Sequence, residues 1–256
     1  MNLATKALAS VPEAAAQALQ NATRIIVFSG AGMSAESGIA TFRDAQTGLW
    51  ANFKPEELAS PAGWRADHAR VWAWYEWRRA LVQKAEPNTG HRAIAELARI
   101  KKVWVITQNV DDLHERAGST GVLHLHGSLF APRCFACAEP ASLSESRLLQ
   151  PVEKLAPPRC ERCQGYVRPG VVWFGEDLPQ GVWKQAQTLV AECDLLIAVG
   201  TSGVVYPAAG LVSSAAQRGI FVLGVNPQTS ALDEVTSLNW RVSAALGLPA
   251  LLSALI

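Results

Sequence analysis

The chain alternates between short apolar runs of strand length and longer segments in which apolar residues recur at helical spacing. The clearest strand candidates are residues 24–29, 102–107, 194–199 and 220–225, with a shorter one at 171–174. Helical patterns cover residues 55–86, 91–100 and 208–218. Runs that are apolar throughout are typical of parallel strands buried on both faces. Their alternation with helices predicts an α/β fold with a doubly wound parallel sheet.

Two segments depart from this alternation. Residues 131–167 hold four cysteines and five prolines and show little periodicity, which predicts a small zinc-binding module. Residues 49–89 hold five of the nine tryptophans and predict a helical insert with a small core of its own. The sheet domain would then consist of residues 1–48, 90–130 and 168–256.

Four of the five cysteines form two C-x-x-C pairs separated by a 22-residue gap, and Cys193 is left over as a buried spare. Two such pairs are typical of a tetrahedral zinc site with four thiolate ligands. No ligand position stays open for chemistry, so we expect one structural Zn²⁺ per chain. The predicted ligands are Cys134, Cys137, Cys160 and Cys163.

Charge and hydropathy restrict the partners and the compartment. The net charge is +1, too small to attract nucleic acid or an anionic membrane without a local patch. Residues 1–22 predict an amphipathic helix rather than a secretory signal, and no apolar run is long enough to span a bilayer. We therefore expect a cytoplasmic protein with neither membrane nor nucleic acid as a partner.

Polar or glycine-rich loops follow four of the predicted strands, at residues 30–38, 108–111, 200–202 and 226. In a doubly wound sheet these loops converge at the carboxyl ends of the strands, where ligands bind. Glycines in the first loop would let backbone N–H groups approach a phosphate, and a helix N-terminus after it would add its dipole. The spacing differs from the G-x-G-x-x-G fingerprint of dehydrogenases.

Each loop also has a purely structural interpretation. A glycine-rich loop after a strand is a tight turn about as often as a phosphate site. Residues 107–111 could be an Asx turn that caps the next helix, which alone would be the favoured interpretation. His124 and His126 would share one face of a strand, and a buried histidine is usually structural. However, Gly127 and Ser128 follow at a strand end, where an imidazole could act as a base.

Taken together, these segments resemble the sirtuin family over residues 24 to about 250. The motifs that carry the resemblance are GAGMSAESGIATFR, TQNVDDLH, HGS, the paired C-x-x-C, VVWFGE, GTS and VN. The resemblance implies a Rossmann-like domain and a smaller zinc lobe, with NAD and an acyl-lysine peptide or protein bound between them. It implies an NAD-dependent protein lysine deacylase, acting as a monomer, whose products are nicotinamide, free lysine and 2′-O-acyl-ADP-ribose.

The resemblance also assigns residues to the site. His126 would be the general base for a ribose hydroxyl, and Asn109 a second catalytic residue. The segment Val171, Val172, Trp173, Phe174, Gly175 and Glu176 would pair with the substrate backbone as an added strand. The NAD-binding residues would be Gly30, Ala31, Gly32, Ser34, Ala35, Glu36, Gly38, Thr41, Phe42, Arg43, Trp50, Gln108, Asn109, Asp111, Gly200, Thr201, Ser202, Asn226 and Ala244.

The chain departs from the family at two positions. Ala40 stands where the family usually has proline. The absence of that proline should loosen the cofactor loop and lower the stability by roughly 0.4–1 kcal/mol. His124 replaces a residue that is often acidic in relatives.

The preferred acyl group depends on Tyr75 and Arg78, which share one face of the predicted helix. Arginine suits forked recognition of a carboxylate, and a tyrosine hydroxyl adds a third donor. A Tyr-x-x-Arg at this place resembles the sirtuins that remove succinyl and malonyl groups, and Ala59 would leave room in the pocket. Without the family context, an amphipathic helix with a solvated Arg78 would be the favoured interpretation.

Two rival functions use the same motifs. NAD-dependent protein ADP-ribosyl transfer would employ the same strand-end loops. A zinc-ribbon module that binds nucleic acid is opposed by the near balance of basic and acidic residues within 131–167 and by its few aromatic residues.

Overall fold

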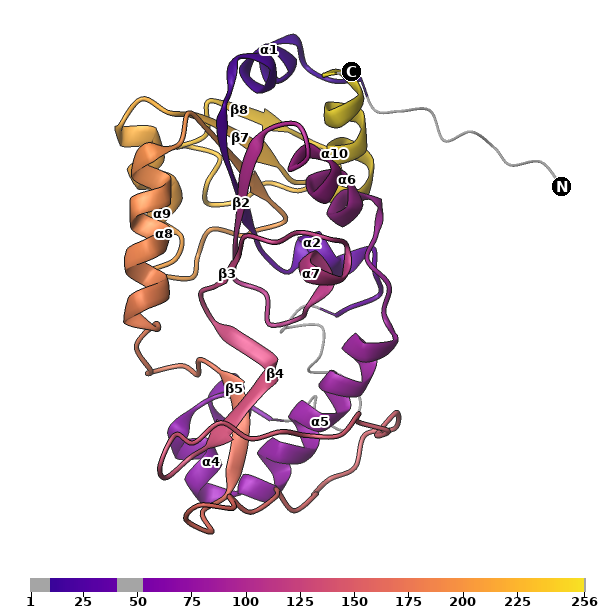
Figure 1. The fold of residues 1–256 in the computed structure, drawn as a ribbon, viewed down its shortest axis with the longest axis vertical. Helices are drawn as coiled ribbons and strands as arrows, with labels where there is room; N and C mark the ends of the chain where they lie inside the picture. Colours follow the sequence, from indigo (N-terminus) through magenta and orange to yellow (C-terminus); the bar gives the residue numbers. More distant parts are fainter. Residues whose placement is uncertain (1–9, 41–52, 256) are drawn as a thin grey trace, which may run out of the picture.

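The computed structural model describes residues 10–40 and 53–255, which form a large lobe around a parallel sheet and a smaller lobe beside it (Figure 1). The sheet order is β3-β2-β1-β6-β7-β8, and all its neighbouring strands are parallel. Counted along the chain this is the order 3-2-1-4-5-6 of the dinucleotide-binding fold, so the predicted Rossmann-like sheet is confirmed. The strands are β1 (Arg24–Ser29), β2 (Lys102–Thr107), β3 (Val122–His124), β6 (Leu195–Val199), β7 (Phe221–Val225) and β8 (Leu238–Trp240).

Strand β1 lies inside the sheet and is covered by helices on both faces, so its side chains on both faces must be apolar. Ile25 and Val27 point to one side of β1, and Ile26 and Phe28 to the other; all four side chains are 0% exposed. Three helices cover the first side: α1 (Glu13–Asn21), α6 (Thr89–Leu97) and α10 (Ala244–Ser253). Two cover the second: α8 (Gln180–Glu192) and α9 (Gly210–Gln217). Each face of the strand therefore contributes to a separate apolar core.

The tryptophan-rich segment forms three helices rather than one. They are α3 (Pro55–Leu58), α4 (Pro61–Ala66) and α5 (His68–Lys84). Two polar side chains start new helices inside the segment: Ser60 accepts a hydrogen bond from Gly63 N, and Asp67 accepts one from Arg70 N. These N-caps satisfy backbone N–H groups that a continuous helix would have bonded internally. Two further one-turn helices are α2 (Gly32–Ala35) and α7 (Leu113–Arg116).

The smaller lobe combines these three helices with an antiparallel pair, β4 (Gly127–Cys134) and β5 (Val167–Val171). Its core includes Trp64, Trp74 and Trp173, each at most 3% exposed. The chain between the two cysteine pairs runs along α5 (Figure 1), where Arg79 donates a hydrogen bond to Ser144 O and forms a buried ion pair with Glu76. The zinc-module segment and the helical insert therefore share one core.

The structure corrects two secondary-structure predictions. Strand β5 ends at Val171, so Val172–Phe174 is not a strand; Val172 N donates to His126 O and Phe174 N to Ala59 O instead. Strand β3 ends at His124, so His126 lies in the turn before β4 and does not share a strand face with His124. Gly127 makes this turn possible, since it has φ +70° and a Cβ there would lie 2.2 Å from Gly170 O.

Among the described helices, none combines the length and the hydropathy that crossing a membrane requires.

A pair of histidines lies buried behind the carboxyl edge of the sheet. His91 is 0% exposed and His114 is 1% exposed, and their ring centroids are 4.8 Å apart. Ser29 Oγ lies 3.0 Å from His114 Nε2 and donates to Thr107 Oγ1. Burial lowers the pKa of His91 to about 4 and lowers that of His114 well below its ordinary value. Both rings are therefore neutral in the folded protein at neutral pH.

We expect this pair to make the fold sensitive to acid. Unfolded histidine titrates near pH ~6.5, so the unfolded chain binds more protons below that pH and stability falls until about pH 4. The titration of His91 alone should lower the free energy of unfolding by about 2 kcal/mol between roughly pH 7.5 and roughly pH 5. Urea unfolding at the two pH values measures this loss, and His91→Asn should reduce it. An unchanged pH dependence in the variant would contradict the assignment.

Candidate functional site

The glycine loop after β1 packs directly against the loop after β6. Gly30 N donates to Val199 O at 3.0 Å, and Gly32 N donates to Gly200 O at 2.8 Å. Gly200 has φ +59°, and a Cβ on it would lie 2.3 Å from Met33 N, so only glycine fits this contact. The expectation that these loops meet is therefore confirmed. The N–H groups of Gly30 and Gly32 join the two loops together through these bonds, and the helix that follows, α2, has a single turn.

Three polar side chains form a buried chain of hydrogen bonds at this edge. Asn109 Nδ2 donates to Ser34 Oγ at 3.1 Å, and Ser34 Oγ donates to Asp111 Oδ2 at 3.0 Å. Burial raises the pKa of Asp111, while hydrogen bonds from Leu113 N and Ser34 partly offset that rise. Asp111 also accepts from Leu113 N at the start of α7, as the Asx-turn interpretation predicts. The arrangement presents an amide and a carboxyl group from one loop to the strand-end region.

The imidazole of His126 is oriented for proton acceptance. Its Nδ1 lies 3.1 Å from Gln108 O, and a carbonyl oxygen can only accept, so Nδ1 carries the hydrogen. Nε2 then keeps its lone pair. Burial lowers the pKa of His126, and the bond to Gln108 O opposes this only in part. The neutral base form therefore dominates at neutral pH.

Gln108 links this base to the other half of the site. Its side chain donates to Thr201 Oγ1 at 2.9 Å, while its backbone carbonyl holds His126. Thr201 is 6% exposed, and its carbonyl accepts from Asn226 Nδ2 at 3.0 Å. Residues after β2, β6 and β7 are thus joined in one network, as the parallel sheet predicts.

His124 has a structural partner that the sequence did not indicate. Its Nε2 lies 2.6 Å from Glu115 Oε1, and its Nδ1 lies 3.1 Å from Asn109 O. Although burial opposes it, the hydrogen bond and charge of Glu115 raise the pKa of His124. A protonated ring donates from both nitrogens, so His124 fixes the backbone of Asn109 against α7. Nothing in the spacing of the two residues indicated this pair.

Several predicted cofactor residues lie at the margins of the site. Ala244 is 3% exposed at the first position of α10, so it offers little surface to a ligand. Glu36 accepts a hydrogen bond from Ala245 N through Oε2, which satisfies that helix end. Ala31, Ala35, Gly38 and Ser202 are exposed. Thr41, Phe42, Arg43 and Trp50 lie outside the described residues.

Tyr75 and Arg78 both lie on α5, and Tyr75 belongs to the core of the smaller lobe. Tyr75 is 4% exposed, and burial raises its pKa to about 12. Burial lowers the pKa of Arg78, and the interactions with Tyr75 and Asp111 act in the opposite direction. Its Cζ lies 4.7 Å from the centroid of the Trp74 ring. Arg78 is thus packed on an aromatic ring rather than fully solvated.

The segment after β5 divides its side chains between two environments. Trp173 is 2% exposed inside the smaller lobe, whereas Phe174 is 52% exposed on its surface. Arg168, which the sequence analysis passed over, is 4% exposed and pairs with Glu176 at the end of this segment. An arginine just before the predicted strand was the only sequence signal for that pair.

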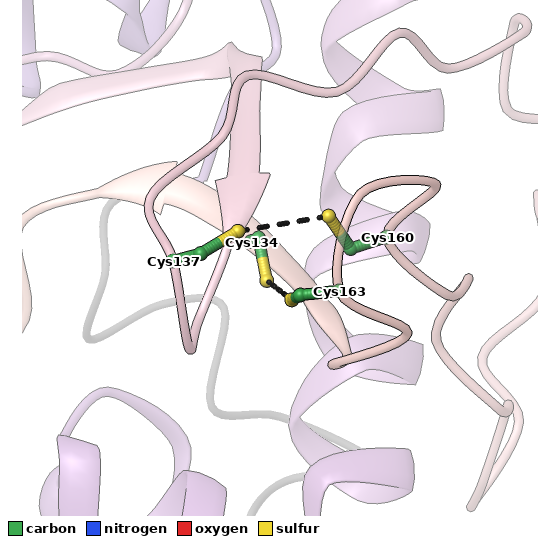
Figure 2. A group of neighbouring side chains, drawn as sticks. All are labelled: Cys134, Cys137, Cys160 and Cys163. Carbon is green, nitrogen blue, oxygen red and sulfur yellow. Dashed lines mark hydrogen bonds between the residues drawn. The ribbon is translucent and has the colours of Figure 1, made fainter.

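The four cysteines of the two C-x-x-C pairs converge in the smaller lobe (Figure 2), and their sulfur atoms all lie within 4.8 Å of one another. Cys134 Sγ is 3.4 Å from Cys163 Sγ, and Cys137 Sγ is 3.8 Å from Cys160 Sγ. These separations are far too long for disulfides. Four thiolates around zinc at the usual bond length would be about 3.8 Å apart, so the donor set fits one tetrahedral zinc.

The two cysteine pairs have matching backbone conformations. Ala138 N donates to Cys134 O at 3.1 Å, and Gln164 N donates to Cys160 O at 2.8 Å. In addition, Ala136 N donates to Cys134 Sγ and Gly165 N to Cys163 Sγ, each at 3.4 Å. The residue after each second cysteine is left-handed, with φ 59° at Ala138 and 61° at Gln164. N–H···S bonds stabilise thiolates and hold ligand orientation, which suits a structural metal centre.

Comparisons with known proteins agree with this geometry. The Sir2 family model matches residues 30–207 of the chain. An NAD-dependent protein deacylase 1 of Pseudomonas aeruginosa is 55% identical over 218 residues, which are 84% of this chain and 87% of that protein. A solved complex of a Sir2 homolog with NAD is 41% identical, with a TM-score of 0.89, and the match covers 96% of this chain and 94% of that one. A Sir2 protein bound to a myristoylated histone peptide is 36% identical, with a TM-score of 0.76, and covers 94% of each chain.

Proposed function

Because this chain belongs to the Sir2 (sirtuin) family and is an NAD-dependent protein deacylase, we propose that it prefers short acyl groups that end in a carboxylate. Succinyl-lysine and malonyl-lysine are the substrates of this class, with acetyl-lysine as a poorer one. The observation that carries the proposal is the position of Arg78 and Tyr75 together on α5, with the Arg78 guanidinium partly buried and packed against the Trp74 ring.

This environment favours an acidic acyl group for an electrostatic reason. Water competes less well for a partly buried guanidinium, so a carboxylate that reaches it gains more than it would on an open surface. Two N–H donors of an arginine match the two oxygens of a carboxylate. The Tyr75 hydroxyl, with a pKa of about 12, stays protonated and supplies a further donor. An acetyl group would gain from neither residue.

We assign the remaining residues of the site by their positions. The loops after β1, β2, β6 and β7 would hold NAD, whose bound form supplies the electrophilic ribose carbon. Asn109 and Asp111 would face the nicotinamide end, and Thr201, Ser202 and Asn226 the adenosine end. His126 Nε2 would accept a proton from a ribose hydroxyl. The products would be nicotinamide, deacylated lysine and 2′-O-acyl-ADP-ribose.

The segment Val171–Glu176 would receive the substrate backbone. The N–H groups of Val172, Trp173 and Phe174 already donate within the chain, to His126 O, Glu176 Oε2 and Ala59 O. Substrate pairing would therefore use carbonyl groups of this segment and Gly175 N. The exposed ring of Phe174 would pack beside the bound peptide.

Replacing Arg78 by methionine tests the acyl preference. We expect kcat/KM for a succinyl-lysine peptide to fall by about 10- to 100-fold, because a charge-assisted hydrogen-bonded pair is lost. The loss for the matched acetyl peptide should be much smaller. Mass spectrometry of the products follows both reactions and also detects any ADP-ribosylated protein. Arg70→Met, which removes the same charge from the start of α5, is the matched control. Equal losses on the two peptides would refute the proposal.

A further inference from the structure

The indole ring of Trp173 connects the segment after β5 to helix α5. Its Nε1 donates a hydrogen bond to Tyr75 Oη at 3.1 Å, and both side chains are buried, at 2% and 4% exposure. An indole N–H can only donate, so the phenol oxygen is the acceptor. The hydroxyl hydrogen of Tyr75 is therefore not directed at Trp173 and remains available to donate elsewhere.

An ion pair holds the indole ring in this position. The guanidinium of Arg168 stacks on Trp173, with Cζ 3.4 Å from the ring centroid. The same guanidinium binds both carboxylate oxygens of Glu176 and donates to Val171 O at 2.8 Å. Glu176 in turn accepts from Trp173 N at 2.9 Å. Both the backbone and the ring of Trp173 are thus fixed by one partly buried ion pair.

Aromatic packing alone would hold the ring less specifically. Trp173 also contacts Trp64, at a centroid distance of 5.6 Å, and Phe135, at 6.4 Å. Rings packed in this way exclude water, but they do not decide which atom of the indole faces Tyr75. The Arg168 stack and the bond to Glu176 do decide it, because they fix both the ring plane and the backbone from which the ring extends.

We propose that Trp173, held by the Arg168–Glu176 pair, is a specificity-positioning residue that directs the Tyr75 hydroxyl as a donor toward a carboxylate-ending acyl group. The inference rests on the proposed function, since it needs the acyl group to lie beside Tyr75 and Arg78. It adds three residues to the selectivity machinery that make no contact with the acyl carboxylate through their side chains. They affect acyl selectivity only by fixing the orientation of the Tyr75 hydroxyl.

Trp173→Phe tests the proposal, because it keeps an aromatic ring but removes the N–H donor together with part of the ring volume. We expect KM for a succinyl-lysine peptide to rise about fivefold or more, with a smaller change for the acetyl peptide. Trp64→Phe makes the same substitution in the same aromatic cluster and should leave the ratio of the two kcat/KM values unchanged. Equal losses on both peptides in Trp173→Phe would overturn the proposal.

A double-mutant cycle adds a readout that packing damage would not produce. If Trp173 acts through Tyr75, the Tyr75→Phe/Trp173→Phe double variant should lose no more succinyl selectivity than Tyr75→Phe alone. Additive losses would refute the proposal. Should Trp173→Phe fail to fold, Glu176→Gln provides the second variant: it weakens the hold on Arg168 and should shift selectivity in the same direction. Unaltered selectivity in a folded Glu176→Gln would also count against it.

The Arg78→Met assay separates this inference from the proposed function. Loss of succinyl preference in Arg78→Met together with unchanged selectivity in Trp173→Phe would overturn the positioning role alone. Unchanged preference in Arg78→Met would overturn the carboxylate pocket and the positioning role together.

Discussion

His126→Ala is expected to lower kcat for lysine deacylation by about 10²- to 10⁴-fold, the range for loss of a general base. The reason is the orientation of the ring: Nδ1 is engaged by Gln108 O, which leaves Nε2 as the proton acceptor. The proton transfer follows release of nicotinamide in the proposed reaction. The variant should therefore still exchange labelled nicotinamide into NAD in the presence of acyl peptide, while deacylated product hardly forms.

The pH profile of the unmodified protein provides an independent measurement. Activity requires neutral His126, so it is lost as pH falls through the pKa of this group. Because burial lowers that pKa, the acid limb of kcat/KM should lie below the ordinary value near ~6.5. His68→Ala removes a histidine in the smaller lobe, stacked on Tyr166, and serves as the control for the substitution. Nearly full deacylation by His126→Ala would refute the assignment.

The sheet could be predicted from the sequence because its determinants are local. Residues 24–29 and 102–107 match β1 and β2 at both ends, since an unbroken apolar run can be buried only between two helical layers. Convergence of the loops after these strands then follows from parallel topology alone. Neither step requires knowledge of which distant residues touch.

The position of His126 could not be predicted in this way. The alternation His-Leu-His favours a strand, but the chain turns there because Gly127 packs against Gly170, and these two residues are separated by the whole cysteine module. The conformation of Val171–Phe174 (VVWF) could not be predicted either, because its apolar pattern resembles a strand. Its N–H groups bond to His126 O and Ala59 O, which no local pattern specifies.

Side-chain direction in the segment after β5 depends on similarly distant contacts. Trp173 and Phe174 are adjacent and both aromatic, so sequence alone does not say which one is buried. Arg168 and Glu176 select Trp173 as the buried ring. Arg168 stacks on the indole, and Glu176 accepts a hydrogen bond from Trp173 N. His124 is a further example, because its role depends on Glu115, which reaches it from helix α7.

Removal of the metal is expected to unfold the smaller lobe and to leave the sheet lobe folded. Zinc binding by four thiolates contributes about 10–16 kcal/mol in small zinc modules, which is as large as the net stability of about 5–15 kcal/mol of a whole folded domain. The lobe includes α5 and Trp173, so its loss should abolish both deacylation and acyl selectivity. The sheet has its own two cores and needs no cysteine from the cluster.

Hydrogen exchange measured after chelation distinguishes the two lobes. We expect protection to vanish in α5, β4 and β5 and to persist in β1, β2 and β6, with one zinc released per chain. Cys163→Ser should reproduce this result without chelator, because Cys163 supplies one of the four clustered sulfur atoms. Cys193→Ser is the matched control: Cys193 is a buried cysteine that packs against the sheet outside the cluster, and its variant should retain zinc. Protection of α5 that survives complete loss of zinc would show that the aromatic core, and not the metal, holds the acyl pocket together.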